Sequence, residues 1–117
     1  MKEHAKEKVK EWINYRSVEN YEETALQLAV RMGNLSIIKL LEKHGADMNC
    51  ITKDGRTIAH LCAKYDKIVP LAYLRQKGFN INSQDSKMVS PFHIAIEDNR
   101  PCSLKFMSNW IDVDFNI

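Results

Sequence analysis

The sequence predicts an all-α solenoid, in which pairs of helices stack side by side and hairpin-like fingers join one pair to the next. Two markers lead to this prediction. Thr24, Thr57 and Ser90 recur at one 33-residue interval, and residues 45–49 (Gly-Ala-Asp-Met-Asn) return after the same interval as residues 78–82 (Gly-Phe-Asn-Ile-Asn). Two markers with the same period indicate a repeat architecture. In such a fold, each repeat buries its apolar face against its neighbours.

The residues that begin at the first marker resemble the ankyrin repeat, whose signature is Thr-Pro-Leu-His-x-Ala on a 33-residue period. Residues 24–29 are Thr-Ala-Leu-Gln-Leu-Ala, residues 57–62 are Thr-Ile-Ala-His-Leu-Cys and residues 90–95 are Ser-Pro-Phe-His-Ile-Ala. No copy is perfect, and the agreement lies in the shared phase of all three. The resemblance covers residues 19–117 and implies helix-turn-helix pairs joined by β-hairpin-like fingers.

The 33-residue phase divides the chain into four segments. We expect three ankyrin repeats, at residues 19–51, 52–84 and 85–117, after an N-terminal segment of residues 1–18. The third repeat is irregular, because its finger marker arrives one residue late and lacks the glycine. We therefore interpret it either as an irregular cap or as a truncated repeat in an excerpt from a longer protein.

Residues 3–15 are expected to form a helix, because Ala5, Val9, Trp12 and Ile13 recur at the spacing of one helical face. Lys and Glu fill the other positions, and the acidic residues interrupt the basic face that a membrane-surface helix would need. We interpret this helix as a solvated cap or as the second helix of a degenerate repeat, since the ends of a solenoid need a polar outer face.

The three pairs of helices follow from the markers. The first helices are expected at residues 24–32, 57–65 and 90–98, and the second helices at residues 35–44, 67–77 and 101–109. The Thr and Ser hydroxyls at the start of the first helices are good N-caps. Pro91 follows its cap directly, where a missing N–H costs nothing. Each pair should turn at Gly33, Asp66 or Asn99, three residue types that tolerate a left-handed backbone.

The fingers are expected to begin at Gly45 and Gly78, where the end of a helix calls for positive φ. Gly55 occupies the turn of one finger, while the matching positions hold Glu22 and Met88. A residue other than glycine at a positive-φ position costs on the order of 1 kcal/mol or more. We therefore expect the fingers that contain Glu22 and Met88 to be reshaped.

Composition excludes several classes of function. A chain of 117 residues with 44% hydrophobic and 27% charged residues is typical of a globular protein, and its net charge of +2 argues against nucleic-acid binding. No apolar run approaches the roughly 20 residues that span a bilayer, so we expect no membrane insertion by this chain. The three cysteines lack Cys-x-x-Cys spacing, which favours reduced thiols and a cytoplasmic or cytosol-facing location.

The histidines and cysteines are the candidates for chemistry, and each has a structural explanation. His60 and Cys62 are two positions apart on a helix, so their side chains point in different directions. The ankyrin resemblance implies that His60 and His93 bridge neighbouring fingers through hydrogen bonds from their rings. Cys62 stands where the signature has a small residue, and a free cysteine behaves as a small buried hydrophobe. We therefore predict no catalytic residue, no metal site and no cofactor.

What remains is a partner-binding surface. In ankyrin-like stacks, partners contact the finger tips and the exposed ends of the first helices, which line a concave face. The matching positions here are Tyr21, Glu23, Arg31, Met32, Lys53, Asp54, Arg56, Lys64, Tyr65, Lys87, Val89, Glu97 and Asp98. Five of them are cations, so we expect the middle of the face, with Tyr65 as apolar anchor, to hold an acidic or extended peptide. The alternative is a solvated surface without a partner.

We therefore interpret the chain as a monomeric, non-catalytic module that binds a protein or peptide partner. Two narrower hypotheses stay open. Residues 31–36 and 68–78 are similar to the ankyrin arm of palmitoyltransferases with an Asp-His-His-Cys catalytic domain, and such an arm would select substrates for a membrane enzyme. A short, irregular array is also typical of a small ankyrin inhibitor or of a pathogen effector.

Overall fold

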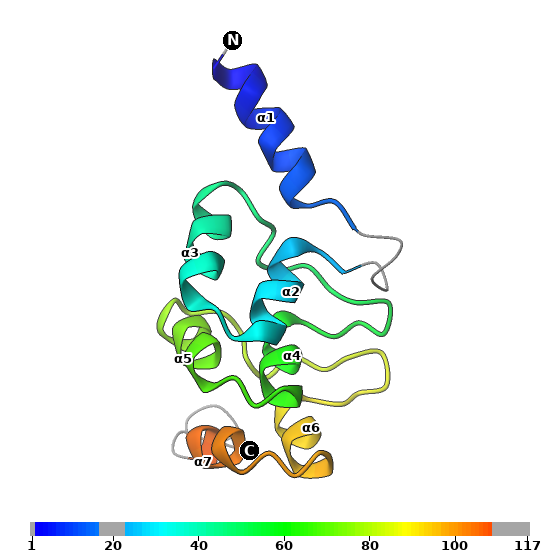
Figure 1. The fold of residues 1–117 in the computed structure, drawn as a ribbon. Helices are drawn as coiled ribbons and strands as arrows, with labels where there is room; N and C mark the ends of the chain where they lie inside the picture. The colour runs from blue at the N-terminus through cyan, green and yellow to red at the C-terminus, as the bar shows by residue number, and fades with distance from the viewer. Residues whose placement is uncertain (1, 17–22, 109–117) are drawn as a thin grey trace.

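The computed structural model describes residues 2–16 and 23–108, which form seven helices (Figure 1). These are α1 (Lys2–Ile13), α2 (Ala25–Met32), α3 (Leu35–Lys43), α4 (Ile58–Lys64), α5 (Ile68–Gln76), α6 (Pro91–Glu97) and α7 (Pro101–Ser108). Helices α2, α4 and α6 stack in one row, and α3, α5 and α7 stack in a second row beside it (Figure 1). Every predicted helix is present. None of the described helices has the length and apolarity needed to cross a membrane.

The first helices begin where the sequence supplies a hydroxyl. Thr24 Oγ1 accepts a hydrogen bond from the Gln27 N–H at 3.2 Å, and Ser90 Oγ accepts one from the His93 N–H at 3.3 Å. These bonds satisfy backbone groups that have no acceptor in the first turn of a helix. Pro91, which follows Ser90, has no such group to satisfy.

All three helix pairs turn at a left-handed residue, as predicted. The φ angle is +74° at Gly33, +57° at Asp66 and +52° at Asn99. Asp66 also connects two pairs, because its Oδ1 accepts hydrogen bonds from the Ser103 N–H at 2.8 Å and from the Ser103 hydroxyl at 2.7 Å. The turn of the second pair therefore fixes the start of α7.

The core runs along the stack and has no single centre. Its largest apolar side chains, each at most 2% exposed, include Leu26, Val30, Ile38, Leu71, Leu74, Ile94 and Met107. Burying one such side chain stabilises the fold by about 1.5–3 kcal/mol. Because these residues lie on successive pairs, each pair depends on its neighbours for stability. A polar contact in the second row adds to this, since the Tyr73 hydroxyl of α5 donates to the Glu42 carboxylate of α3.

The two described fingers share one hairpin turn. The Thr52 N–H donates to the Arg56 carbonyl at 3.0 Å, and one repeat period later the Asp85 N–H donates to the Val89 carbonyl at 2.9 Å. The side chain of the first residue also accepts from the N–H of the last in both fingers, at 3.2 Å and 3.0 Å respectively. We call these turns finger 52–56 and finger 85–89.

Met88 does not reshape its finger, so that expectation is wrong. Its φ of +65° matches the +78° of Gly55. Finger 85–89 holds this backbone because Asp85 Oδ1 accepts a further hydrogen bond from the Lys87 N–H at 2.8 Å, whereas finger 52–56 has Thr52 in place of this aspartate. The remaining expected case, Glu22, lies outside the described residues.

Helix α1 points away from the stack and is attached to it at its C-terminal end (Figure 1). The Asn14 amide donates to the Gly45 carbonyl at 3.1 Å, and its oxygen accepts from the Asp47 N–H at 2.7 Å. Helix α1 begins at residue 2 and α3 at residue 35, which is one repeat period later. The interpretation of residues 1–18 as a cap or a degenerate repeat, like the division into three repeats, stays a prediction.

Candidate partner-binding groove

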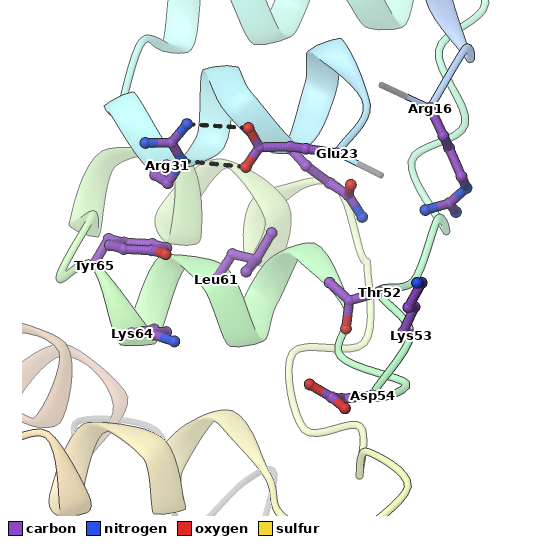
Figure 2. Close-up of a pocket in the computed structure, with 10 residues that line it drawn as sticks. Arg16, Glu23, Arg31, Thr52, Lys53, Asp54, Leu61, Lys64 and Tyr65 are labelled. Atoms are coloured by element: carbon purple, nitrogen blue, oxygen red, sulfur yellow. Dashed lines mark hydrogen bonds and ion pairs between the residues drawn. The ribbon is translucent and has the colours of Figure 1, made fainter. Parts of the chain in front are cut away.

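A groove of about 620 Å³ lies between the row of first helices and finger 52–56 (Figure 2). It is lined by Arg16, Glu23, Gln27, Arg31, Thr52, Lys53, Asp54, Leu61, Lys64 and Tyr65. Six of these belong to the predicted surface: Glu23, Arg31, Lys53, Asp54, Lys64 and Tyr65. Tyr21, also predicted, lies outside the described residues. Contact between the six and a partner stays a prediction.

The helical side of the groove presents Arg31, Lys64 and Tyr65, which lie at the C-terminal ends of α2 and α4 (Figure 2). Lys64 Nζ is 5.8 Å from the centroid of the Tyr65 ring, a distance typical of a cation–π contact. Leu61 adds an apolar surface to the same side and is 9% exposed. The groove therefore combines positive charge with an apolar patch.

An ion pair lies inside the groove (Figure 2). Arg31 Nε is 3.1 Å from Glu23 Oε2 and Arg31 Nη2 is 3.0 Å from Glu23 Oε1, so the pair is bidentate. The Arg31 side chain is 41% exposed and the Glu23 side chain 19%. Arg31 therefore contributes less net positive charge to the face than the sequence suggests.

Arg56 connects the two fingers. Its Nε is 3.4 Å from Oδ2 of Asp85, whose side chain is 2% exposed. The pKa of Asp85 is lowered chiefly by the hydrogen bond from the Val89 N–H, and also by Lys87 N–H and Arg56, although burial acts in the opposite direction. Arg56 thus has a structural role that the sequence analysis did not assign to it.

The other predicted surface residues lie outside this groove. Met32, Lys87, Glu97 and Asp98 are exposed, whereas Val89 packs partly against the core. Met32 follows Arg31 at the end of α2, and Glu97 and Asp98 lie at the end of α6. The predicted surface therefore extends beyond the groove, and its contact with a partner stays a prediction.

His60 joins α4 to finger 85–89 by hydrogen bonds to Thr57 and Val89, as the ankyrin resemblance implied, and we call this set of contacts the clamp. The residue is 0% exposed, and its Nδ1 accepts from the Thr57 N–H at 3.0 Å. The ring proton therefore lies on Nε2, which donates to the Val89 carbonyl at 2.7 Å. Burial lowers the pKa of His60, so the neutral ring is favoured. For His93, whose Nδ1 lies 2.8 Å from Ser90 Oγ, a bridge to a next finger stays a prediction.

The cysteines are unpaired thiols, of which Cys50 and Cys62 are buried and Cys102 is exposed. Burial raises the pKa of Cys62 to about 12, so this thiol is protonated and unreactive at neutral pH. Among the residues whose side chains the structure describes (7–16 and 23–108), no three His, Cys, Asp or Glu are grouped in a way that would hold a metal ion.

Four residues of the groove were missed by the sequence analysis: Arg16, Gln27, Thr52 and Leu61. The repeat phase gives a signal for two of them, because Gln27 lies one period before His60 and Thr52 lies one period before Asp85. Arg16 follows α1, where no marker fixes the phase. Leu61 has an apolar side chain, so its pattern indicates the core and not a binding surface.

The fold defines the chain as an α-solenoid repeat protein, and comparison with known proteins gives the class of repeat. The ankyrin repeat family model matches residues 21–53. Alpha-latrocrustotoxin-Lt1a of Latrodectus tredecimguttatus is 33% identical over 76 residues, which is 64% of this chain but only 5% of the toxin. Residues 21–53 therefore match an ankyrin repeat, and the stacked helix pairs give the chain an all-α repeat fold.

Proposed function

We propose that the chain is a non-catalytic module that holds a protein or peptide partner in the groove between α2, α4 and finger 52–56. Ankyrin repeats generally mediate protein–protein interaction, which supports the class of function. The observation that supports this location is the meeting of six predicted surface residues around one groove of about 620 Å³. An extended segment with one apolar side chain for Leu61 and Tyr65 fits such a site.

The charges of the groove favour an acidic partner. Its cations are Arg16, Arg31, Lys53 and Lys64, and its anions are Glu23 and Asp54. This excess of positive charge would attract an acidic segment and repel a basic one. We propose in addition that the module acts as a monomer in the cytoplasm, or on the cytosolic side of a larger protein, where its three thiols stay reduced. No specific observation favours the palmitoyltransferase arm or the inhibitor.

Capture of partners from a lysate, with chemical cross-linking, tests the location of the site. The variant Lys53→Ala/Lys64→Ala/Tyr65→Ala removes two cations and the aromatic anchor of the groove. We expect this variant to lose the proteins that the wild-type chain captures, because aromatic and cationic anchors dominate interface energies. Arg56 is left intact, since its ion pair with Asp85 supports the fingers.

The matched control is Tyr15→Ala/Lys39→Ala/Lys77→Ala, which removes the same residue types away from the groove. Tyr15 is 65% exposed, and Lys39 and Lys77 lie over the Tyr73 ring at 5.5 and 5.9 Å. This control should capture the same proteins as the wild-type chain. Equal capture by both triple variants, with unchanged thermal unfolding, would refute the proposed site.

A further inference from the structure

Two cations from successive first helices lie on one side of the groove. Arg31 is in the last turn of α2 and Lys64 in the last turn of α4, one repeat period apart. Figure 2 shows both on the same side as the Tyr65 ring, across the groove from Arg16 and Lys53. We call Arg31, Lys64 and Tyr65 the carboxylate subsite, for the reason that follows.

The Arg31 guanidinium already holds a carboxylate. Glu23 binds its Nε and Nη2 in the side-on, bidentate geometry that arginine offers to carboxylates, at 3.1 and 3.0 Å. Glu23 belongs to the segment before α2, and its side chain is partly exposed to the groove. Lys64, on the neighbouring helix, has its contact with Tyr65 at 5.8 Å. The Arg31 guanidinium is therefore occupied by a carboxylate of the chain itself, and Lys64 lies beyond the Tyr65 ring on the same side of the groove (Figure 2).

We propose that Glu23 is an internal substitute for an acidic side chain of the partner, and that a partner Asp or Glu binds the carboxylate subsite by displacing it. This inference rests on the proposed function and specifies the chemistry of that site. Displacing Glu23 from Arg31 costs little free energy, because a partly exposed ion pair contributes little to stability. The Glu23 carboxylate also regains water when it leaves. Lys64 adds positive charge on the same side of the groove, where it would attract further acidic side chains of the segment.

Glu23 thereby limits affinity for acidic partners. Among the described residues that line the groove, four are cations and two are anions when Glu23 is ionised, and only one anion is left without it. Removing the Glu23 charge frees the Arg31 fork and strengthens the attraction for an acidic segment. The affinity should rise for acidic segments only, since a neutral segment gains nothing from a freed guanidinium.

The test uses a fluorescent acidic heptapeptide, Gly-Glu-Glu-Leu-Glu-Glu-Gly, and its counterpart with glutamine in place of glutamate. Fluorescence anisotropy of the full 117-residue chain at low salt gives both affinities. We expect Glu23→Gln to bind the acidic peptide roughly threefold to fivefold more tightly than the wild type, the range of one exposed ion pair. The gain should shrink at high salt, on the order of 0.5 M, and Glu23→Gln/Arg31→Gln should abolish it.

The matched control is Glu11→Gln, which makes the same charge change at an exposed position of α1. It should leave the affinity for the acidic peptide unchanged. An equal gain in both variants would show an effect of net charge alone and would overturn the proposal. So would a gain that survives Arg31→Gln, or no preference for the acidic peptide in any variant.

The outcomes separate this inference from the function on which it rests. If Lys64→Ala/Tyr65→Ala weakens peptide binding while Glu23→Gln leaves it unchanged, the groove is the binding site and the displacement of Glu23 is wrong. If the groove variants and the wild type bind the peptide equally, both proposals fail. Thermal unfolding of Glu23→Gln should stay within about 2 °C of the wild type, as expected for the loss of an exposed pair.

Discussion

The first and second helix pairs use different side chains for the same clamp, and the difference is one hydrogen bond. In the second pair, His60 accepts from the Thr57 N–H and donates from Nε2 to the Val89 carbonyl of the next finger. In the first pair, Gln27 Oε1 accepts from the Thr24 N–H at 2.9 Å, but its buried Nε2 has no hydrogen-bond partner among the described residues. This repeat position therefore accepts a hydrogen bond from the cap residue of its own helix in both pairs. It binds the next finger only in the second pair, through His60.

The comparison shows why a repeat position can vary without loss of the fold. The bond to the cap residue is local and depends only on an acceptor three residues after the cap, which glutamine and histidine both supply. The bond to the finger needs a donor at a fixed distance across two repeats, and the rigid imidazole supplies it. Stability should therefore differ along the stack: the contact between α4 and finger 85–89, at Val89, should be more stable than the contact between α2 and finger 52–56, at Arg56.

The largest expected effect comes from removing the complete clamp. His60→Ala should lower the free energy of unfolding by about 3 kcal/mol, because it leaves a cavity and an unsatisfied Thr57 N–H. Gln27→Ala should cost about 1 kcal/mol less, since it breaks a single hydrogen bond. Urea denaturation monitored by circular dichroism measures both values. Equal losses would show that the finger bond of His60 contributes nothing.

The two fingers give the second contrast, between a glycine and a methionine at equivalent left-handed positions. A Cβ on Gly55 would lie 3.0 Å from the backbone nitrogen of Ser86, in addition to the strain of its φ of +78°. Gly55→Ala should therefore destabilise the chain by about 2 kcal/mol. Met88→Gly, which only removes strain, should stabilise it by up to about 1 kcal/mol. Changes of the same sign in both variants would contradict the equivalence of the fingers.

Completing the first clamp is the third test. Val89 lies one repeat period after Arg56, and each carbonyl already accepts one finger hydrogen bond, at 2.9 and 3.0 Å respectively. A carbonyl has a second lone pair, which at Val89 accepts from His60. The imidazole of Gln27→His should donate to the Arg56 carbonyl in the same way and stabilise the chain by about 1 kcal/mol. Thermal unfolding should then shift upward by roughly 4 °C, and a downward shift would refute the analogy.

The sequence was sufficient for the helices and their turns because local rules determine them. Hydroxyl caps, left-handed residues and one 33-residue period each constrain a few neighbouring residues, and they agree at every described pair. Finger 85–89 shows the limit of such rules. A methionine at positive φ costs energy locally, but hydrogen bonds to the Asp85 carboxylate offset the strain.

The candidate site was predicted only in part, because ion pairs depend on side-chain rotamers and not on the repeat phase. Arg31 and Arg56 both counted as surface cations, yet one binds Glu23 and the other binds the buried carboxylate of Asp85. Arg16 enters the groove from a segment without a repeat marker. The predicted binding surface follows from periodicity, whereas its ion pairs need the structure.

The smallest expected effect is the pH dependence of the clamp. The pKa of His60 in the folded chain is lowered by burial, although the Val89 carbonyl and Asp85 act in the opposite direction and Arg56 reinforces the lowering. An unfolded histidine titrates near about 6.5. As pH falls through that value, the unfolded chain takes up a proton that the folded chain resists, so the clamp's contribution is complete above about pH 6.5 and declines below it.

The variant His60→Gln, which copies the Gln27 clamp, lacks this pH-dependent contribution. We expect the stability advantage of the wild type over His60→Gln to be smaller at about pH 5.5 than at about pH 7.5. An advantage that grows on acidification would mean that the protonated ring is favoured in the fold, and the neutral clamp with its proton on Nε2 would be wrong.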